Sequence, residues 1–447
     1  MRIVIGGAGA VGTHLATLLS RERHDIVLID EDGEKLRKLT TNLDIMGFTG
    51  KPASIEVQKQ AGVGSADLFI GVTTDETRNV TCCMIASTLG CRKTVARIDN
   101  YEYQDKQFKE FFRQMGISSL VYPELLAAKE IASAIKMSWI RQWWEVGSGD
   151  LVMIGVMMRQ NAHILNIALK DLGRQNLPYH IVAIKRDSET LIPRGDDTIQ
   201  EGDEVFFMTT RKHINTVREV SGKMDYPEIK RLIIMGGGRV AYRTATLLPR
   251  DVTVTIIEKD ADRCNKLTGM MADHDNVMVI HGDGRDMGLL EEEGLRHSQA
   301  FLALTGSDEQ NILSCLNARS MGITKTVAQV ENLEYIQMAE HLSIGTIINK
   351  MTIAATSIYQ TLLKADVDNM KSLTLSNADV AEFTVSADAR CTKKTVREIQ
   401  FPRGVNVGGL VRNGEGMLVR GNTVIQEGDH VVVFCLNGMI QKVQKYF

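Results

Sequence analysis

Glycines near the start of the chain have the spacing of a phosphate-binding loop. Gly7, Gly9 and Gly12 follow an apolar run and form the pattern Gly-x-Gly-x-x-Gly at the predicted start of a helix. In such a loop the first glycine allows a tight turn, the second lets a pyrophosphate approach the backbone, and the third lets the helix pack on the strand. The free N–H groups and the positive dipole end of that helix would then bind the phosphates.

An acidic residue follows this loop at the position that a nucleotide site requires. The next predicted strand reads IVLID and ends in Asp30, where a carboxylate would accept hydrogen bonds from ribose hydroxyls. The order of strand, glycines, helix, strand and acid therefore predicts a nucleotide site. The alternative interpretation is a glycine turn that serves packing alone.

A second loop of the same kind lies about halfway along the chain. Gly236 and Gly238 follow the apolar run LIIM, Ala241 takes the third glycine position, and Glu258 ends the next predicted strand. Alanine is tolerated at that third position. The pattern therefore predicts a second, related site. Because both predicted sites carry an acid at the ribose position, they would repel a 2′-phosphate, which disfavours NADP.

The two predicted sites differ in charge. Arg239 stands beside the second loop, where the first loop has only Ala10. The added positive charge would favour a more highly charged ligand, such as ATP or ADP, in the second site and a dinucleotide in the first. Arg239 could equally form an ion pair with a carboxylate of the protein.

Further polar residues follow the predicted strands, at the edge of the sheet where ligands bind in such folds. Arg78 and Arg97 of the first half become Gln310 and Gln329 in the second, so the two sites are related but not equivalent. Each arginine could serve a phosphate or form an ion pair within the protein. The other edge positions are Gly50, Thr73, Thr74, Asp75 and Asp99 in the first half, and Gly282, Asp283, Thr305, Gly306 and Glu331 in the second.

The whole chain is a tandem duplication. Residues 49–79 align with residues 281–311 without a gap, and TVARIDNYEY from residue 94 matches TVAQVENLEY from residue 326. Each half ends in a similar tail, PRGDDTIQEGDEV and VRGNTVIQEGDHV. Repetition over this length and in this order indicates a chain of four parts. We name them N1 (1–140), C1 (141–225), N2 (226–366) and C2 (367–447).

The elements that position the loops follow from the apolar periodicity. Short apolar strands alternate with helical stretches in N1 and again in N2, which predicts parallel sheets covered on both faces. C1 and C2 have short strands, Gly-Asp turns and one brief helix each. The predicted fold is therefore α/β, with two Rossmann-like doubly wound domains alternating with two small α+β modules. The predicted strands of N1 are 2–6, 25–30, 44–48, 67–72, 93–98 and 118–122, its predicted helices include 11–20, 33–41 and 76–90, and the brief helices of C1 and C2 are predicted at 164–172 and 394–400.

Two long amphipathic helices are predicted at equivalent places, over 124–140 and 351–365, where each N module joins its C module. Their apolar residues recur at helical spacing. Two interpretations stay open. Each helix packs on its own module, or it crosses over and packs on a sister subunit.

The composition of the 447 residues excludes several classes of protein. Lys and Arg number 52 against 55 Asp and Glu, which gives a net charge of −3 and lacks the basic footprint of a nucleic-acid binder. The 7 cysteines include no C-x-x-C motif, which disfavours a zinc site or a disulfide framework and favours a reducing cytosol. Cys82 and Cys83 are expected on a buried helix face. Residues 3–20 carry no charge, but their glycines and polar residues make a poor signal peptide or membrane span.

Little in the sequence supports catalysis. A dehydrogenase needs a group that moves a proton beside the hydride, usually with an orienting partner, and C1 and C2 show no His–Asp or Ser–Lys constellation. No H-E-x-x-H motif occurs, and no Gly-Lys-Ser/Thr follows the glycines. We therefore predict no enzyme, no catalytic residues and no metal site. The competing classes are an NAD-dependent oxidoreductase and a nucleotide-sensing DNA-binding regulator, which would need a helix-turn-helix and a basic face that we do not find.

These residues together resemble the TrkA family, the regulatory subunits of bacterial Trk potassium uptake systems, which carry two RCK (KTN-type) units in one chain. The resemblance rests on the N1–C1–N2–C2 order, on MRIVIGGAGAVG with Asp30, on GGGRVA with Glu258, and on the paired IQEGDEV and IQEGDHV tails. It covers essentially the whole chain. Glycine motifs alone are common among Rossmann proteins, and the duplicated pairing with the Gly-Asp tail makes the resemblance specific.

The resemblance implies a protein that binds NAD(H) and also ATP or ADP. It implies a peripheral position on the cytoplasmic face of the bacterial inner membrane, bound to an integral membrane potassium channel protein of the TrkH or TrkG type. With two units in each chain, a homotetramer would supply an eight-unit gating ring, whose shape follows the bound nucleotide and pulls on the channel gate. No nucleic-acid partner is implied.

The family's ligand-binding positions are carried over residue by residue. Many RCK units have Gly-Asp-Ala after the third strand, whereas this chain has Gly50-Lys51-Pro52 in N1 and Gly282-Asp283-Gly284 in N2, so no contacts are carried over there. The implied ligand-binding residues are Gly7, Ala8, Gly9, Ala10, Val11, Asp30, Thr73, Thr74 and Arg97 in N1, and Gly236, Gly237, Gly238, Arg239, Val240, Glu258 and Thr305 in N2.

Overall fold

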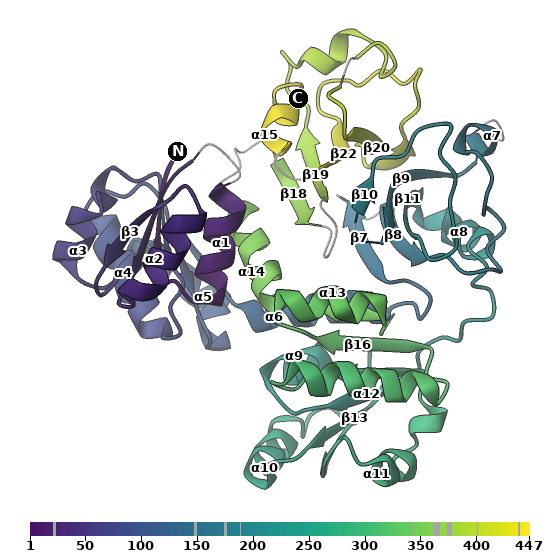
Figure 1. Ribbon diagram of the computed structural model, residues 1–447, viewed down its shortest axis with the longest axis horizontal. Helices are drawn as coiled ribbons and strands as arrows, with labels where there is room; N and C mark the ends of the chain where they lie inside the picture. The colour runs from purple at the N-terminus through teal and green to yellow at the C-terminus, as the bar shows by residue number, and fades with distance from the viewer. Residues whose placement is uncertain are drawn as a thin grey trace. The chain divides into compact units, whose positions relative to one another are not determined.

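Four β-sheets follow one another along the chain in the computed structural model (Figure 1). The molecule divides into two compact units, which we describe separately. Unit 1 comprises Met1–Leu126 with Lys350–Leu363, and unit 2 comprises Ala127–Asn349 with Lys364–Phe447. The structure describes the chain except for residues 21–23, 147–149, 174–176, 188, 343, 361–366, 373–377, 400 and 437–438.

N1 is built on six parallel strands in the order β3-β2-β1-β4-β5-β6. The inner strands are nearly continuous runs of buried residues, as expected of a sheet covered on both faces. The strand order reverses between β1 and β4, so the carboxyl ends of these strands flank the crevice where doubly wound folds bind ligands. The strands are β1 (Arg2–Gly6), β2 (Asp25–Asp30), β3 (Met46–Thr49), β4 (Leu68–Gly71), β5 (Thr94–Arg97) and β6 (Ser119–Val121), and the helices are α1 (Ala10–Ser20), α2 (Gly33–Asn42), α3 (Ile55–Gln60), α4 (Glu76–Thr88) and α5 (Lys106–Gln114).

N2 repeats this architecture, with the strand order β14-β13-β12-β15-β16-β17 and parallel pairing throughout. Its strand order reverses between β12 and β15, which gives N2 an equivalent crevice. The strands are β12 (Arg231–Met235), β13 (Thr253–Glu258), β14 (Val277–His281), β15 (Ala300–Ala303), β16 (Lys325–Gln329) and β17 (Thr346–Ile348), and the helices are α9 (Arg239–Leu247), α10 (Ala261–Met270), α11 (Met287–Glu292), α12 (Asp308–Ser320) and α13 (Leu333–His341).

C1 and C2 are antiparallel sheets of five strands each, in the orders β10-β9-β11-β8-β7 and β18-β19-β22-β20-β21. One apolar core within unit 2 joins them, and it contains Met153 and Phe206 of C1 with Val432 and Phe434 of C2. The elements are β7 (Gln142–Val146), β8 (Leu151–Met157), α7 (Leu169–Gly173), β9 (Tyr179–Arg186), β10 (Glu189–Leu191), β11 (Glu204–Thr210) and α8 (Ile214–Val220) in C1, and β18 (Val367–Ser372), β19 (Ala378–Thr384), β20 (Val405–Arg412), β21 (Glu415–Leu418), β22 (His430–Leu436) and α15 (Ile440–Gln444) in C2.

The repeated Gly-Asp tails have a structural role in these sheets. Asp203 is buried before β11, where its carboxylate binds the guanidinium of Arg186 at 2.8 Å and the N–H of Gln200 at 2.8 Å. Asp429 does the same before β22 with Arg412 at 2.7 Å. Each tail therefore closes its turn with a buried, charge-assisted pair.

The second connecting helix crosses from one half of the chain to the other. Helix α14 (Lys350–Gln360) lies at the end of N2 in sequence but belongs to unit 1, where it packs against α1 (Figure 1) and the end strand β6. Its Ala354, Ala355 and Ile358 are fully buried. Helix α6 (Pro123–Ile135) follows N1, and the chain from Ala127 onward belongs to unit 2. Helix α14 thus packs on N1 of the same chain, which is neither its own module nor a sister subunit, the two partners that the sequence interpretation considered.

The predicted helices differ from the structure at three places. The first connector ends at Ile135 rather than at 140, and residues 361–365 of the second lie outside the described residues. The brief helix of C1 is shorter than predicted, at Leu169–Gly173. The helix predicted at 394–400 is wrong: the structure has a 3₁₀ helix at Arg390–Lys393, followed by turns in which Thr395 pairs with Val424. The side chain of Thr395 and its N–H both donate to Glu398, a local arrangement that competes with helix formation.

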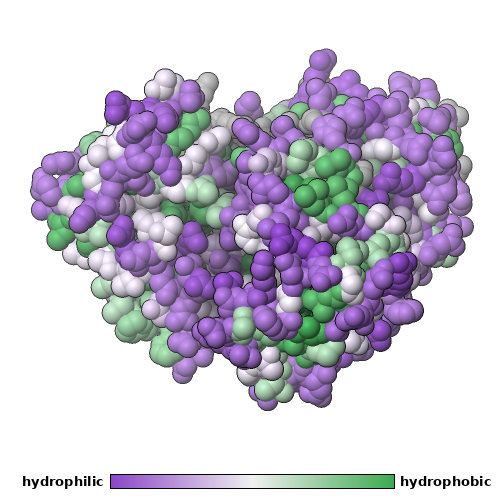
Figure 2. All heavy atoms as spheres, turned by 60° about the horizontal axis from the view of Figure 1, so that its bottom comes forward, coloured by the Kyte–Doolittle hydropathy of each residue, from purple (hydrophilic) through white to green (hydrophobic). Residues whose placement is uncertain are grey.

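The face of the molecule drawn in Figure 2 is mostly hydrophilic, and hydrophobic residues gather there in separate small patches. Within the described part of the chain, every helix is too short or too polar to cross a lipid bilayer.

Candidate nucleotide-binding sites

The first glycine loop joins β1 to α1 and leaves room for a ligand at one glycine. Gly7 has a φ of 115°, which only glycine adopts easily, and a side chain at Gly12 would place its Cβ 1.9 Å from the carbonyl oxygen of Gly7. At Gly9, by contrast, a Cβ would find only the carbonyl oxygen of Val72, at 4.0 Å. Packing therefore explains glycine at 7 and 12 but not at 9.

The backbone beside Gly9 also has donors to offer. Among the described residues, no acceptor takes the N–H groups of Gly9, Ala10 or Val11, which stand at the start of α1. Free N–H groups at a helix N-terminus, together with open space at the middle glycine, form a cradle that fits a phosphate.

The loop of N2 between β12 and α9 has the same design with one difference. Gly236 has a φ of 99°, and a Cβ at Gly238 would meet only the carbonyl oxygen of Leu304, at 4.0 Å. Ala241 is buried at the third position, so this loop does accommodate a methyl group. Gly237 is confined, because a Cβ would lie 2.9 Å from Leu267 and 3.0 Å from a carboxylate oxygen of Glu258. Arg239 and Val240 begin α9, with Arg239 exposed.

Asp30 and Glu258, the two acids predicted to bind ribose, each accept hydrogen bonds from the glycine loop of their own module. Asp30 accepts hydrogen bonds from the N–H of Ala8 at 2.6 Å and from the N–H of Asp32 at 2.9 Å, one on each carboxylate oxygen. Glu258 accepts from Gly237 at 2.7 Å and from Asp260 at 2.9 Å in the same way. Each oxygen keeps a second lone pair, so a ribose hydroxyl would add to this arrangement rather than compete with it. Both acids therefore shape the loop before any ligand arrives.

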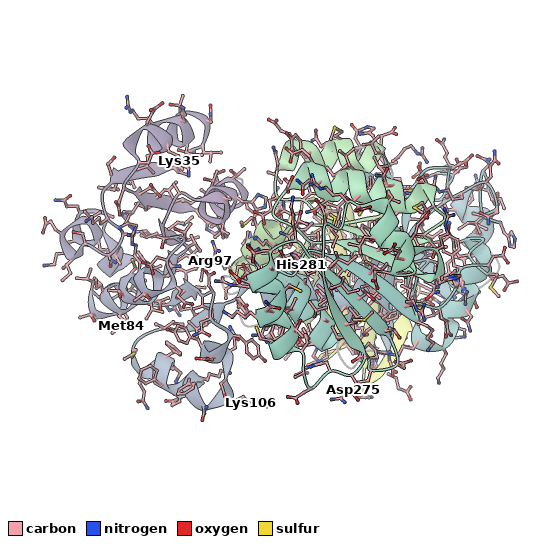
Figure 3. All side chains as sticks on the ribbon, turned by 90° about the horizontal axis from the view of Figure 1, so that it is seen from below. Lys35, Met84, Arg97, Lys106, Asp275 and His281 are labelled. Carbon is pink, nitrogen blue, oxygen red and sulfur yellow. The ribbon has the colours of Figure 1, made fainter. Side chains whose placement is uncertain are left out.

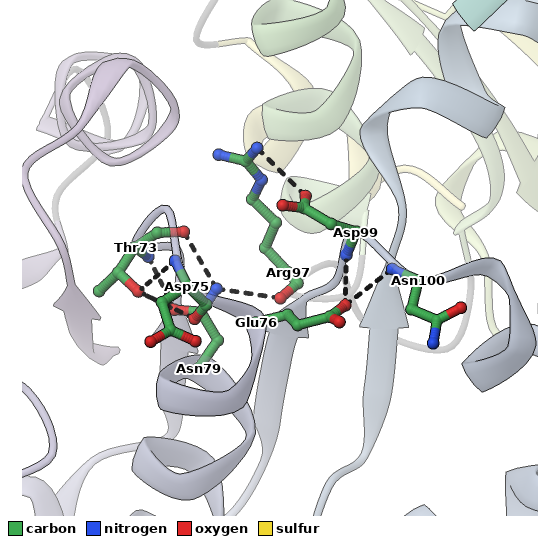
Figure 4. Close-up of polar contacts among 7 residues, drawn as sticks. All are labelled: Thr73, Asp75, Glu76, Asn79, Arg97, Asp99 and Asn100. Atoms are coloured by element: carbon green, nitrogen blue, oxygen red, sulfur yellow. Dashed lines mark hydrogen bonds and ion pairs between the residues drawn. The ribbon is translucent and has the colours of Figure 1, made fainter. Parts of the chain in front are cut away.

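A buried asparagine fixes the edge of each sheet beside the loop, and the sequence analysis missed it. The amide oxygen of Asn79 accepts from the N–H of Thr73 at 2.8 Å and from its hydroxyl at 2.7 Å, while its amide nitrogen donates to the carbonyl oxygens of Thr73 and Arg97 (Figure 4). Asn311 repeats these bonds with Thr305 and Gln329. The available signal was the ungapped alignment of the two halves, which pairs these asparagines.

Thr74 has a different position from Thr73. It is exposed on the loop that leads to Asp75, the residue whose side chain caps α4 by accepting from the N–H of Arg78. Thr74 therefore faces solvent at the carboxyl edge of the sheet. The hydroxyl of Thr73 donates a hydrogen bond to the side chain of Asn79, which holds Thr73 in place at the edge of the sheet.

Both arginines of the first site form ion pairs. Arg97 contacts Asp99 at 3.4 Å, and its buried Nε has no hydrogen-bond partner among the described residues (Figure 4). Arg78 reaches from α4 to Glu31, just past β2, at 3.1 Å. Gln329 keeps the first of these contacts, since it donates to Glu331 at 3.1 Å. The ion-pair interpretation thus holds for both arginines, and the Nε–H of Arg97 remains available to donate a hydrogen bond to an acceptor.

The segments after β3 and β14 are occupied by protein contacts. A Cβ at Gly50 would lie 2.7 Å from Val57, so this glycine is required by packing against α3. The carboxylate of Asp283 binds Arg285 at 2.6 Å and Lys259 at 3.4 Å, and the Arg285 guanidinium holds its pKa well below the usual range. His281, labelled in Figure 3, ends β14, and its ring Nε2 lies 3.1 Å from the carbonyl oxygen of Lys259. Gly50 and Asp283 are thus held by contacts within the protein.

Groups that could do chemistry are few near the two loops. The described residues contain no cluster of three or more His, Cys, Asp or Glu side chains fit to hold a metal ion. All seven cysteines are buried and free, and burial raises the pKa of Cys82 to about 12 and that of Cys83 above its usual range. The prediction that Cys82 and Cys83 lie on a buried helix face is confirmed. What the sites offer is binding geometry: open backbone donors, fixed edges and acids at the ribose position.

Comparisons with known proteins identify the family of the chain. The family described as the TrkA-N domain matches residues 3–123 and 232–350, and the TrkA-C domain matches residues 153–222 and 380–447. A curated relative from Halomonas elongata, the "Trk system potassium uptake protein TrkA", is 30% identical over 454 residues, which cover 100% of this chain and 98% of the relative.

Solved structures share the fold at low identity. The structure titled "Crystal Structure of the GsuK RCK domain" has a TM-score of 0.61 at 16% identity, covering 100% of this chain and 94% of that one. The structure titled "GsuK channel bound to NAD" has a TM-score of 0.61 at 15% identity, covering 100% of this chain and 78% of that one. The predicted fold class, two Rossmann-like domains alternating with two small modules, is therefore confirmed.

Proposed function

The chain belongs to the TrkA family, and from this premise we propose that it is a regulatory subunit that senses nucleotides and gates a membrane potassium channel. The observation that carries the proposal is the space at the middle glycine of each loop. Neither Gly9 nor Gly238 is required by packing, since a Cβ at either position would meet no atom closer than 4.0 Å. A glycine that packing does not need is explained by a ligand that approaches the backbone there.

We propose NAD(H) for N1 and ATP or ADP for N2. In N1 the phosphates would lie on the free N–H groups from Gly9 to Val11, the ribose on Asp30, and the ligand's edge contacts on Thr73, Thr74 and Arg97. In N2 the equivalent groups are Gly236 to Val240, Glu258 and Thr305, and the exposed Arg239 adds a positive charge beside the loop. A solved GsuK channel of the same fold is titled as bound to NAD, which supports the dinucleotide.

The regulatory step follows from linkage. A ligand shifts a conformational equilibrium only through its different affinities for the two states, and about 1–3 kcal/mol for each site is a typical coupling. Because several symmetric sites add their biases, an assembly of these chains would approach the roughly 5.5 kcal/mol that a near-complete switch requires. Duplicated sites in a symmetric oligomer suit a sensor better than they suit an enzyme.

Assembly into a homotetramer with an eight-unit ring is part of the proposal. Helices α5 and α13 hold equivalent places in the two N modules, and each exposes two apolar side chains. These are Phe111 in α5 with Met115 just after it, and Met338 in α13 with Leu342 just after it. Exposed apolar groups at matching positions mark a contact surface that both halves share. The proposed partner is an integral membrane potassium channel of the TrkH or TrkG type, which would place the protein on the cytoplasmic face of the inner membrane.

The test of the binding sites uses calorimetry on the full chain. Gly9→Asp fills the phosphate space of N1 with an anion, so NADH binding at that loop should be lost, while Gly9→Ala, which adds only a methyl group into open space, keeps the fold. Gly238→Asp is the matched change in N2. Undiminished NADH and ATP affinities in both Asp variants would remove the basis of the proposal.

The test of regulation uses the channel. NADH, NAD and ATP should each bind without being consumed, and they should change potassium flux through a reconstituted channel partner in a Gly9- or Gly238-dependent way. Steady oxidation of NADH with a small substrate would instead assign the chain to the oxidoreductases.

A further inference from the structure

C1 docks on N2 within unit 2, at the edge of the N2 sheet where its strands begin. Lys325, the first residue of β16, donates hydrogen bonds to the carbonyl oxygen of Ile140 and, at 3.0 Å, to the hydroxyl of Thr346. That hydroxyl donates to the carbonyl oxygen of Arg141 at 3.3 Å. We call this contact between C1 and N2 the seam. Because the strands of N2 are parallel, the seam lies at the opposite edge of the sheet from the nucleotide loop.

A small cavity of about 60 Å³ lies in the seam, and its charge is entirely positive. That volume is roughly twice the share of one water molecule in the liquid, about 30 Å³. No Asp or Glu belongs to its lining. The basic side chains that line it are Arg141, Arg159 and Lys223 of C1, and Arg319 and Lys325 of N2.

Ion pairing within the protein compensates little of this charge. Arg141 has Glu204 at 4.0 Å, and Lys223 lies over the ring of Tyr226 at 5.0 Å. Among the described residues, neither Arg159 nor Arg319 has a carboxylate partner. Holding several cations close together without counter-charges is costly, and an anion bound among them would offset that cost.

Titration behaviour agrees with the geometry. Burial, with the repulsion of neighbouring arginines, lowers the pKa of Lys325 to about 7 and that of Lys223 to about 8. Each lysine is thus poorly solvated and repelled by the rest of the cluster when charged.

The adjoining cavity on the same seam shows the contrast. It measures about 180 Å³ and shares Arg141 and Arg159, but its lining also includes Asp187, Glu204 and Glu340. Lys185 forms an ion pair with Glu340 there. The seam therefore balances its charges in one cavity and leaves them unbalanced in the other.

We propose that the positive cavity between C1 and N2 binds a small oxyanion of the phosphate class, either inorganic phosphate or the terminal phosphoryl group of a nucleotide. Arginine and lysine are the side chains that bind such groups best. Because the cations come from both modules, the bound anion joins C1 to N2. The proposal does not depend on the nucleotide loops, since it rests on residues at the other edge of the sheet.

The first experiment follows thermal unfolding of the full chain with and without inorganic phosphate. Arg319 is half-buried in the last turn of α12, so Arg319→Gln removes one cation with little loss of packing. In phosphate-free buffer this variant should melt about 2–3 °C above the unmodified chain, because a repulsion is relieved. Phosphate should raise the melting temperature of the unmodified chain but not that of Arg319→Gln.

The matched control is Arg113→Gln, which removes an exposed arginine from the last turn of α5 and should keep the full response to phosphate. Arg159→Gln is the second variant and should behave as Arg319→Gln does. The proposal would be overturned if Arg319→Gln and Arg159→Gln lowered the melting temperature equally with and without phosphate, so that phosphate still stabilised both variants.

Calorimetry then distinguishes the two sources of the anion. Inorganic phosphate is titrated into the unmodified chain, and ADP into the Gly9→Asp/Gly238→Asp double variant, whose nucleotide loops are filled. If Arg319→Gln lowers the affinity for inorganic phosphate on the order of tenfold, the result supports the free anion as the ligand. If adding Arg319→Gln to the double variant lowers the affinity for ADP to the same extent, the result supports the phosphoryl group. If Arg319→Gln changes the affinity for neither inorganic phosphate nor ADP, the proposed anion site is contradicted.

Discussion

Gly12 and Ala241 hold the same place in the two glycine loops, but only the first excludes a side chain. A Cβ at Gly12 would lie 1.9 Å from the carbonyl oxygen of Gly7, whereas Ala241 is buried in N2 with its methyl group in place. Sequence reasoning treats the two residues as interchangeable at this position. The structure shows that the N1 loop is the tighter of the two.

This difference gives a prediction for the loops. Gly12→Ala should destabilise N1 by several kcal/mol, about 3 or more, because a backbone atom of the loop must move to admit the methyl group. Gly9→Ala adds the same group into open space and should cost less than about 1 kcal/mol. Urea unfolding of both variants checks the order, and equal effects would contradict the tight contact at Gly12.

Asn79 carries a second prediction at the residue scale. Replacing it by Ala leaves the buried N–H of Thr73 and the carbonyl oxygen of Arg97 without their partner, which should lower the free energy of unfolding by about 2–4 kcal/mol. Asn311→Ala should do the same in N2, and Asn317→Ala, an exposed change on the same helix, should have almost no effect. Urea unfolding measures all three, and a cost for Asn79→Ala below that of Asn317→Ala would refute the interpretation.

Site residues were predictable from sequence only where their type is tied to backbone shape. Gly7, Gly9 and Asp30 lie together at the carboxyl edge of the sheet, because a glycine turn between strand and helix leaves few alternatives. The sequence could not show that Asp30 also binds the N–H of Ala8, since that contact depends on the depth of the turn. Asn79 was missed because an asparagine inside a helix has no local signature.

At the scale of elements, the alternation of apolar strands and helices was sufficient to predict the N modules. Each predicted strand of N1 overlaps an observed one, because buried parallel strands are short apolar runs between turns. Helices α3 and α5 lie in gaps between strands where helices were expected without stated bounds. The helix expected at 394–400 is wrong, because Glu398 binds Thr395 locally. The crossing of α14 could not be read from periodicity, which gives a buried face but not its partner.

The start of strand β16 gives a pH prediction. The pKa of Lys325 falls from 10.5 to about 7 on folding, so between about pH 7 and 10 the unfolded chain holds a proton that the folded chain lacks. The free energy of unfolding should therefore rise with pH in that window, by at most about 1.4 kcal/mol per pH unit for one group. Lys325→Met should flatten this rise in phosphate-free buffer, and an unchanged slope would show that Lys325 stays charged in the seam.

At the scale of the whole molecule, the matched apolar positions on α5 and α13 predict how copies assemble. Phe111→Asp places a charge in the proposed contact surface and should shift the proposed homotetramer to smaller species, as should Met338→Asp. Gln114→Asp changes charge on the same helix outside that set and serves as the control. Sedimentation velocity measures the species, and an unaltered tetramer in both Asp variants would place the contact elsewhere.

The crossing of α14 has a consequence for how the protein is made. N1 is complete in sequence at Leu126, but the helix that packs on α1 begins only at Lys350. At about 5–20 residues per second, a ribosome needs roughly 10–45 s to synthesise the residues between them. During that time the nascent first domain has an uncovered apolar face, so its last packing step waits for the second domain to leave the ribosome. The first domain, although synthesised first, is therefore completed only after the residues of N2 up to α14 have been made.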